Sequence, residues 1–305
     1  MKRRAVGWLA CLAAGLLPLA ACGSSAGSSS PSAAPSGGGV RSVRVAVIVM
    51  ENHEFGSIMG SSEAPFLNDL ASRSTLLTNY DAVAHPSLPN YLALLGGSTF
   101  GITSDCTGCT VNGPNLVDQL ATAGVGWRAY MEDLPSPCFT GASAAGYVLR
   151  HDPFLYFDDV RTDPQRCANV VPYSNLAADA AGGRLPPFVW ISPNLCHDMH
   201  DCSVGAGDAW LAQAVPGVMA SLAPDGVLIV VWDEGTTDAA CCGASTGGGH
   251  VAAIVAGPGA RSAATVDTPS NHYSMLALIE TKLGLPLLAG ARTAPSINDV
   301  LRNAA

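Results

Sequence analysis

The fold is decided by Val45-Ala46-Val47-Ile48-Val49-Met50, an unbroken apolar run rich in β-branched residues that leads into Glu51-Asn52-His53. Such a run is typical of a strand that is buried on both faces. Further strands are predicted at 126–131, 188–192, 226–232 and 251–256, and helical patterns separate them. Strands that alternate with helices favour an α/β fold: a largely parallel central sheet with helices on both faces.

The helical stretches are recognised by apolar spacing together with proline and glycine at their ends. Asp208 is predicted to open one of them, which runs to Val215 and is ended or kinked by Pro216. The stretch from 133 to 185 is rich in loops, and its elements are not placed by the pattern. The other predicted helices cover 64–72, 87 to about 96, 114–123 and 272–283.

Three of the predicted strands end in groups that can bind a cation. Glu51 and Asn52 follow the first strand, Asp233 and Glu234 follow the strand at 226–232, and the loop 197–201 holds two histidines and two aspartates. In open α/β sheets, ligands bind beyond the carboxyl ends of the strands. Carboxylates gathered there repel each other unless a cation or proton lies between them. The sequence therefore predicts a divalent metal ion, of unspecified identity, at this edge.

A candidate nucleophile stands in His85-Pro86-Ser87-Leu88-Pro89-Asn90-Tyr91, just before an apolar helix. Ser87 lies where that helix would begin, so its hydroxyl is either an N-cap or a nucleophile. A helix N-terminus also favours a phosphate or other oxyanion. A metal ion near Ser87 would ease ionisation of its hydroxyl and neutralise charge on the transferred group.

The chain begins with Lys2, Arg3 and Arg4, followed by a short apolar run that ends at Leu19-Ala20-Ala21-Cys22. This pattern predicts a lipoprotein signal peptide at 1–22, with Cys22 as the lipidated residue. Ordinary signal cleavage is the alternative. Residues 23–39 are only Ser, Gly, Ala and Pro, which indicates a flexible linker, and 40–305 then form the catalytic domain. We expect an exported protein that is anchored by lipid to the outer face of the cell membrane, or is secreted.

The net charge of −9 argues against nucleic acid as a partner, and membrane contact is expected through the lipid anchor only. Eight of the ten cysteines lie in the predicted domain, and an even number in an exported domain predicts disulfides. Cys106/Cys109, Cys138/Cys167 and Cys196/Cys202 are plausible pairs, while Cys241 and Cys242 can bridge to each other or to separate partners. Zinc binding by Cys106-x-x-Cys109 is the competing interpretation.

The motifs Met50-Glu51-Asn52-His53, His85-Pro86-Ser87-Leu88-Pro89-Asn90, Asp198-Met199-His200-Asp201, Trp232-Asp233-Glu234 and Asn271-His272-Tyr273-Ser274 occur in this order. Together they resemble the bacterial phosphoesterase family of acid phosphatases and phosphatidylcholine-type phospholipases C, within the alkaline phosphatase superfamily. The resemblance covers about 44–285 and implies an alkaline-phosphatase-like fold. The chain is also similar to compact secreted actinobacterial acid phosphatases, some of which act on phosphoinositides.

The resemblance implies a role for each motif. Glu51, Asn52, Ser87, Asp233 and Glu234 would bind the metal, and Ser87 would also be the nucleophile. His200 would lie near the transferred phosphoryl group and protonate the leaving oxygen. Substrate contacts are expected from His85, Asn90, Asp201 and His250; His250 follows a glycine run that lets a ligand approach the backbone. His272 is as readily structural, and His53, His151 and His197 are interpreted as surface or packing residues.

The favoured function is hydrolysis of phosphate monoesters by attack of Ser87. Glu234 stands where members of the family often have aspartate, which leaves the identity of the metal open. The long insertions of the phospholipases are missing, which favours a phosphatase over a phosphodiesterase or phospholipase C with the same site. A sulfatase would have arginine where Tyr91 stands. Gly243-Ala244-Ser245-Thr246-Gly247 matches the serine-hydrolase pattern G-x-S-x-G but follows no strand. A non-catalytic lipoprotein that binds a ligand in the cell envelope is the alternative from another class.

Overall fold

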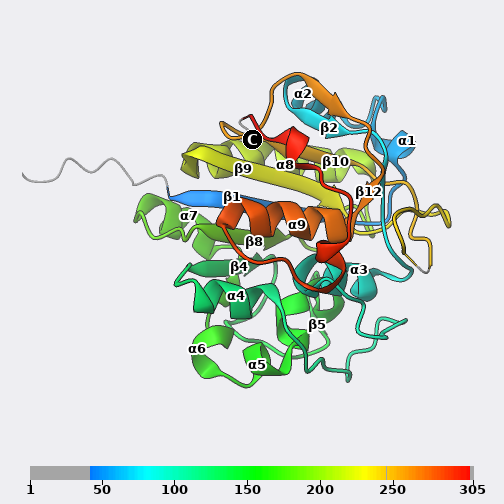
Figure 1. Cartoon of the computed structure of the whole chain (residues 1–305). Coiled ribbons are helices and arrows are strands. Elements are labelled where there is room, and N and C mark those ends of the chain that lie inside the picture. The colour runs from blue at the N-terminus through cyan, green and yellow to red at the C-terminus, as the bar shows by residue number, and fades with distance from the viewer. Residues whose placement is uncertain (1–41, 245, 303–305) are drawn as a thin grey trace, which may run out of the picture. The chain divides into compact units, whose positions relative to one another are not determined.

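The central strand of the sheet is β1 (Val43–Met50), the stretch from which the fold was predicted. This computed structural model describes residues 42–244 and 246–302 (Figure 1). The predicted signal peptide, the linker, Cys22 and Ser245 lie outside these residues. Eight strands form the main sheet in the order β11-β2-β10-β9-β1-β8-β4-β7. The strands are β1, β2 (Thr75–Leu77), β3 (Tyr80–Asp81), β4 (Trp127–Met131), β5 (Ser143–Ala144), β6 (Tyr147–Val148), β7 (Val170–Pro172), β8 (Phe188–Ser192), β9 (Leu222–Trp232), β10 (Ala253–Ala256), β11 (Ala264–Val266) and β12 (Ser270–Asn271).

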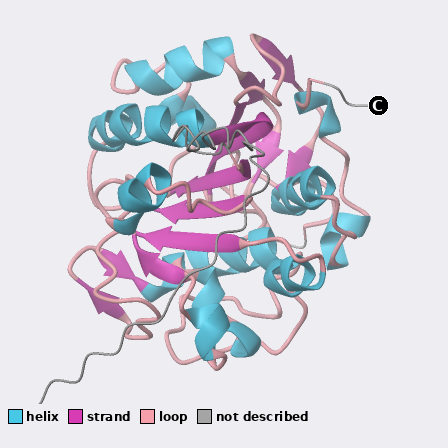
Figure 2. Ribbon diagram, turned by 90° about the vertical axis from the view of Figure 1, so that its left-hand side faces the viewer, coloured by secondary structure: helices cyan, strands magenta, loops and turns pink. Residues whose placement is uncertain are grey.

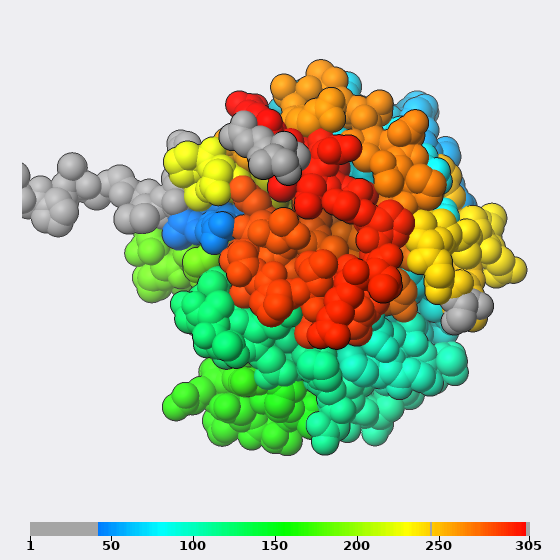
Figure 3. All heavy atoms as spheres, viewed as in Figure 1, coloured from blue at the N-terminus to red at the C-terminus, as the bar shows by residue number. Residues whose placement is uncertain are grey.

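Helices cover both faces of this sheet (Figure 2). In Figure 1, α9 lies in front of the sheet and α8 behind it. In the space-filling view, α9 and the segments after it, orange to red, cover much of the face toward the viewer (Figure 3). The α-helices are α1 (Phe55–Ile58), α2 (Pro65–Arg73), α3 (Ser87–Gly96), α4 (Leu116–Thr122), α5 (Asp158–Arg161), α6 (Pro164–Cys167), α7 (Asn175–Ala181), α8 (Val204–Ser221) and α9 (His272–Leu283). Four short 3-10 helices are η1 (Leu149–His151), η2 (Pro153–Tyr156), η3 (Ala289–Arg292) and η4 (Asn298–Val300).

The α/β prediction is confirmed, since β1 pairs in parallel with β8 on one side and β9 on the other. Burial on both faces explains why these strands read as continuous apolar runs rather than alternating ones. β10, predicted as a strand, pairs antiparallel with both β9 and β2. Apolar runs carry no signal for strand direction, so this feature is visible only in the structure.

The helix predicted from Asp208 to Val215 has wrong bounds. α8 begins at Val204, where Ser203 caps it, and continues through Pro216 to Ser221. Buried apolar residues on both sides of Pro216 offset the cost of about 3 kcal/mol for an interior proline. Asp208 lies inside α8, and its carboxylate accepts hydrogen bonds from the N–H groups of Phe66 and Leu67 in the first turn of α2.

Four disulfides join Cys106 to Cys109, Cys138 to Cys167, Cys196 to Cys202, and Cys241 to its neighbour Cys242. Each plausible pair from the sequence is formed. The zinc interpretation of Cys106 and Cys109 is wrong in this structure, because a disulfide leaves no thiolate to bind metal. Within the described ranges, no helix combines the length and apolar character needed to cross a membrane.

Candidate active site

The acidic residues meet at one edge of the sheet because their strands are parallel neighbours. β1 lies between β9 and β8, so Glu51 follows the central strand and Asp233 and Glu234 follow the next one. The loop after β8 brings Asp198 and His200 to the same edge. The predicted convergence of three strand ends is therefore confirmed.

Ser87 is the first residue of α3, and Pro86 occupies the N-cap position without a side-chain hydrogen bond. The N-cap alternative for Ser87 is thus wrong. Its Oγ lies 3.1 Å from Glu51 Oε2 and 3.0 Å from Glu234 Oε1. The Ser87 hydroxyl, itself buried, is held between two carboxylates from different strands.

Glu51 is at the centre of the cluster and is fully buried. Besides Ser87, it accepts a hydrogen bond of 2.5 Å from the hydroxyl of Tyr91. Tyr91 stands four residues after Ser87 on α3, and this spacing places both side chains on one face of the helix. The i, i+4 relation to Ser87 was the signal in the sequence that could have identified Tyr91.

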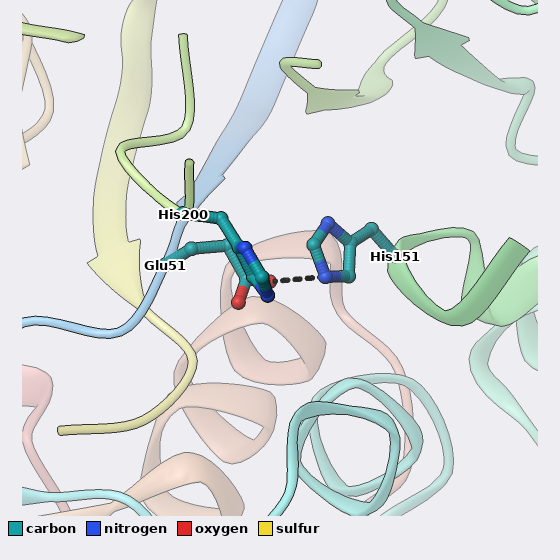
Figure 4. A group of neighbouring side chains, drawn as sticks. All are labelled: Glu51, His151 and His200. Atoms are coloured by element: carbon teal, nitrogen blue, oxygen red, sulfur yellow. Dashed lines mark ion pairs between the residues drawn. The ribbon is translucent and has the colours of Figure 1, made fainter. Parts of the chain in front are cut away.

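His151 is a correction to the sequence analysis, which interpreted it as a surface or packing residue. It is buried, with Nε2 3.1 Å from Glu51 Oε1 and Nδ1 3.1 Å from Asp198 Oδ2. With Glu51 and His200 it forms a group whose ligand atoms lie within 4.8 Å of one another (Figure 4). His151 comes from η1, inside the loop-rich stretch that the pattern could not place, and no motif marked it.

Asp233 and Glu234 contact different parts of the site. Asp233 Oδ1 accepts a hydrogen bond of 3.3 Å from the backbone N–H of Asn52, which has a left-handed φ of 59°. Among the described residues, the buried Oδ2 of Asp233 has no hydrogen-bond partner. Glu234 pairs through Oε2 with His85 Nδ1, and His85 Nε2 donates to the carbonyl of Thr237. Asn52, His85 and Glu234 line an open hollow of about 360 Å³, together with Pro86, the residue before Ser87.

His200 is held from both sides. Its Nδ1 donates to Asp201 Oδ1 at 2.7 Å, and its Nε2 lies 3.1 Å from an Nη2 of Arg150. Arginine has only donors, so Nε2 accepts and the proton of the neutral ring is on Nδ1. Asp201 therefore orients His200.

Two predicted substrate contacts have structural partners instead. The fully buried Asn90 accepts from the N–H groups of Val83 and Ala84, both at 3.0 Å, and donates to the Ala84 carbonyl at 2.7 Å. Asn90 thereby fixes the segment that leads into α3.

His250 contacts the protein itself, with its ring stacked on Phe55 and Nε2 3.1 Å from the Thr78 carbonyl. The glycine run before it makes room for the protein's own chain rather than for a ligand. A Cβ at Gly248 would lie 2.6 Å from the Ala84 carbonyl oxygen, in the segment before Ser87.

The remaining histidines fit their expected roles. His272 is buried, contacts the Asp233 carbonyl with Nε2 at 2.6 Å and the Tyr80 hydroxyl with Nδ1 at 2.8 Å, and so supports the strand end structurally. His197 pairs with Glu132 and stacks on Trp210. His53 is half-buried, and its burial lowers its pKa.

Burial is the main influence on the electrostatics of the cluster. Burial, followed by the charges of Asp233 and Asp198, raises the pKa of Glu51 well above its usual value. Burial and then Glu234 raise the pKa of Asp233, and burial raises that of Asp198 to about 7. The pKa of Glu234 is also raised by burial. Burial, with the charges of Arg150 and His200 behind it, lowers the pKa of His151. Without a cation, these carboxyls therefore bind protons more tightly than ordinary carboxyls do.

These pKa shifts predict how stability changes with pH when metal is absent. A carboxyl with a raised pKa stabilises the folded protein at low pH, and this stability is lost as pH rises from about 4 through the folded pKa. The buried His151 and His272 have lowered pKa values, so their contribution to stability increases as pH rises. This increase ends at about pH 6.5, the usual pKa of histidine. We therefore expect the melting temperature in chelator to fall most steeply between about pH 6.5 and pH 8.

The measurement is thermal unfolding in chelator across this pH range, with and without excess divalent cation. A bound cation replaces the protons on the carboxyls, so it is expected to flatten the decline. A melting temperature in chelator that stays level or rises over the same range would contradict the prediction.

The donor atoms of the site suit a divalent cation. They are carboxylate oxygens, imidazole nitrogens and a hydroxyl, and the unpartnered Asp233 Oδ2 is a ligand atom without a partner among the described residues. The cysteines of the domain are all in disulfides, so thiolate is absent from the described donors. Such oxygen and nitrogen sets are typical of magnesium, calcium, manganese and zinc sites.

Comparisons with known proteins agree with this geometry. A family model described as the phosphoesterase family matches residues 61–286. Over 261 residues, 84% of this chain and 82% of that protein, the chain is 35% identical to a phosphatidylinositol-3-phosphatase of Mycobacterium tuberculosis. A probable acid phosphatase of Kluyveromyces lactis is 30% identical over 274 residues, which is 86% of this chain but only 63% of the yeast protein.

The fold is similar to that of a solved alkaline phosphatase superfamily protein from Vibrio parahaemolyticus, with a TM-score of 0.53. That match covers 85% of this chain and 72% of the other at 14% identity, and it confirms the alkaline-phosphatase-like architecture. The family model covers most of the domain, and the mycobacterial relative aligns along most of both chains. The chain therefore belongs to the phosphoesterase family and is a hydrolase of phosphoric ester bonds.

Proposed function

We propose that the chain is an exported, metal-dependent phosphatase that hydrolyses phosphate monoesters with Ser87 as nucleophile. The observation that supports this most directly is the position of the Ser87 hydroxyl, 3.0 Å from Glu234 and 3.1 Å from Glu51 at the start of α3. A serine is a weak nucleophile unless a base takes its proton, and these two carboxylates are within reach of it.

In the first step, Ser87 Oγ attacks phosphorus in line with the leaving oxygen. The Oγ–P bond forms, the P–O bond to the alcohol breaks, and the serine proton passes to Glu234 or Glu51. In the second step, water attacks the phosphoserine and gives one proton to His200, which has protonated the alcohol in the first step; the Oγ–P bond breaks, and inorganic phosphate leaves. The proton that the carboxylate holds then returns to Ser87. Both steps transfer the same phosphoryl group, so one set of residues serves both.

His200 is proposed to protonate the leaving oxygen. Asp201 holds its Nδ1 at 2.7 Å, so Nε2, which Arg150 contacts at 3.1 Å, is the atom that would carry the transferred proton. The carboxylate stabilises the imidazolium form, since a charge-assisted hydrogen bond strengthens when the ring is protonated. Among the predicted substrate-contact residues, we retain His85, which lines the hollow beside Glu234, and assign Asn90 and His250 to structure.

The metal would be held by Glu51, Asn52, Ser87, Asp233 and Glu234, and His151 is an additional donor within reach of Glu51. When bound, a divalent cation supplies Lewis-acid stabilisation of negative charge on the serine oxygen and the phosphoryl group. The positive charge of the cation would also offset the repulsion among the buried carboxylates.

The substrate class is proposed from the size of the domain and from its relatives. A phosphoinositide monoester is a candidate, because the mycobacterial relative is named for that activity. Export is supported by the four disulfides, since such bonds persist in oxidising compartments. Lipidation at Cys22 would then place the site at a membrane surface.

The function is tested with the full chain on p-nitrophenyl phosphate, bis-p-nitrophenyl phosphate and vesicles that contain phosphatidylinositol 3-phosphate. We expect turnover that chelator abolishes and an added divalent cation restores. The kcat/KM for p-nitrophenyl phosphate should exceed that for the bis-ester by at least about tenfold. A preference for the bis-ester would instead identify a phosphodiesterase. No turnover with any cation would overturn the proposal in favour of a non-catalytic binding protein.

A further inference from the structure

Arg150 brings a permanent positive charge to an acidic site. It is part of η1, directly before His151, and its Nη2 contacts His200 Nε2 at 3.1 Å. Across the residues that the structure describes, no other lysine or arginine contacts a side chain of the cluster around Ser87. Its Nε is buried without a hydrogen-bond partner there, and lies 3.5 Å from Asp105 Oδ2.

Asp105 makes the contacts that a phosphoryl group would make. Its Oδ1 accepts a hydrogen bond of 3.0 Å from the N–H of Leu88, the residue after Ser87 in the first turn of α3. Its Oδ2 faces the guanidinium of Arg150. A carboxylate and a phosphoryl group use the same donors, a backbone N–H and a guanidinium, so Asp105 occupies an anion position beside the nucleophile.

The contact between Arg150 and His200 has a consequence for catalysis. Because the guanidinium donates to Nε2, this nitrogen carries no proton in the observed arrangement. His200 can protonate a leaving oxygen only after the guanidinium has turned away from it. An anion that draws Arg150 toward itself would free Nε2 in the same movement.

We propose that Arg150 is the residue by which this enzyme selects monoesters: its guanidinium turns from His200 and Asp105 to pair with the non-bridging oxygens of a dianionic phosphate. A diester carries one negative charge instead of two, and a second organic group leaves it only two non-bridging oxygens. Its electrostatic attraction to the Arg150 guanidinium is therefore weaker, while the surrounding carboxylates still repel it. This inference rests on the proposed function and adds a determinant of specificity to it.

The test compares Arg150→Gln, Arg150→Lys and the control Arg128→Gln on the two p-nitrophenyl esters. Arg128 is a similarly half-buried arginine that pairs with Asp179 away from the site. We expect Arg150→Gln to lower kcat/KM for the monoester by about 10- to 100-fold and for the bis-ester by less than about threefold. Lysine should restore part of the loss, since it keeps the charge, and the Arg128 variant should leave both values unchanged.

Binding of inorganic phosphate, measured by calorimetry, provides a readout that needs no turnover. We expect Kd to rise by about tenfold or more in Arg150→Gln, and to fall in Asp105→Asn because the competing carboxylate is gone. Equal losses for both esters, or an unchanged phosphate Kd, would overturn the inference. If the unaltered chain hydrolyses neither ester, the proposed function fails, and the phosphate measurements still decide the role of Arg150.

Discussion

The Ser87→Ala variant is expected to lose hydrolysis of p-nitrophenyl phosphate, with kcat lowered by roughly 10⁴- to 10⁶-fold. Without Oγ no bond to phosphorus forms, and the neighbouring carboxylates have no other hydroxyl in the same position. The fold should tolerate the change, because alanine is a good residue in the first turn of a helix and the lost contacts are only those to Glu51 and Glu234.

Ser274→Ala is a matched control, since Ser274 is also a buried serine in the first turn of a helix, α9. That variant is expected to remain active and to lose about 0.5–2 kcal/mol of stability with its capping box. Rapid quenching of the unaltered enzyme during turnover should trap phosphate on Ser87, detectable by peptide mass spectrometry. Activity in Ser87→Ala within about tenfold of the unaltered enzyme would exclude Ser87 as nucleophile.

The Glu51→Gln variant is expected to lower kcat/KM by roughly 10²- to 10⁴-fold and to weaken binding of divalent cations. The amide is nearly the same size as the carboxylate. Its oxygen can still accept from Tyr91, and its NH2 group can donate to the Ser87 oxygen, so the change removes charge while it preserves packing. The same change should raise the melting temperature in chelator at about pH 8, because one buried acid with a raised pKa is gone.

Glu280→Gln is the control for Glu51→Gln, because it removes a buried acid that lies outside the site. It shows which changes in stability come from the loss of any buried acid. Glu280 is also fully buried, with its pKa raised to about 7 by burial, but its carboxylate accepts from the N–H of Leu288, away from Ser87. Its substitution should likewise raise stability in chelator while cation binding stays unchanged. Calorimetric titration with manganese or zinc measures this, and an unaltered affinity in Glu51→Gln would remove Glu51 from the proposed ligands.

The sequence predicted those parts of the site that follow buried strands. Met50 and Trp232 end long apolar runs, and parallel strands place their carboxyl ends at one edge, so the pattern alone predicts that Glu51 and Asp233 meet there. His151 could not be expected at this edge, because it lies on a single turn of 3-10 helix between loops and reaches Glu51 only through tertiary packing.

The errors have a common physical cause, since local patterns do not say which partner a side chain will find. Aspartate is a residue type that often begins a helix, yet Asp208 lies inside α8 and caps the first turn of α2. The glycines before His250 permit close approach, but the approaching group is the backbone at Ala84 rather than a ligand. In both positions the residue type was interpreted correctly and the partner was a distant part of the same chain.

The position of β1 in the sheet also sets when the enzyme can begin to work. The first strand to be synthesised is the central one, and its neighbours β8 and β9 come from the second half of the chain. Pairings between such distant segments close late in folding. A chain that is made from its N-terminus therefore cannot bring Ser87 to Glu234 until about three quarters of it has been synthesised. The order of strands thus makes assembly of the proposed site one of the last events in the synthesis and folding of this domain.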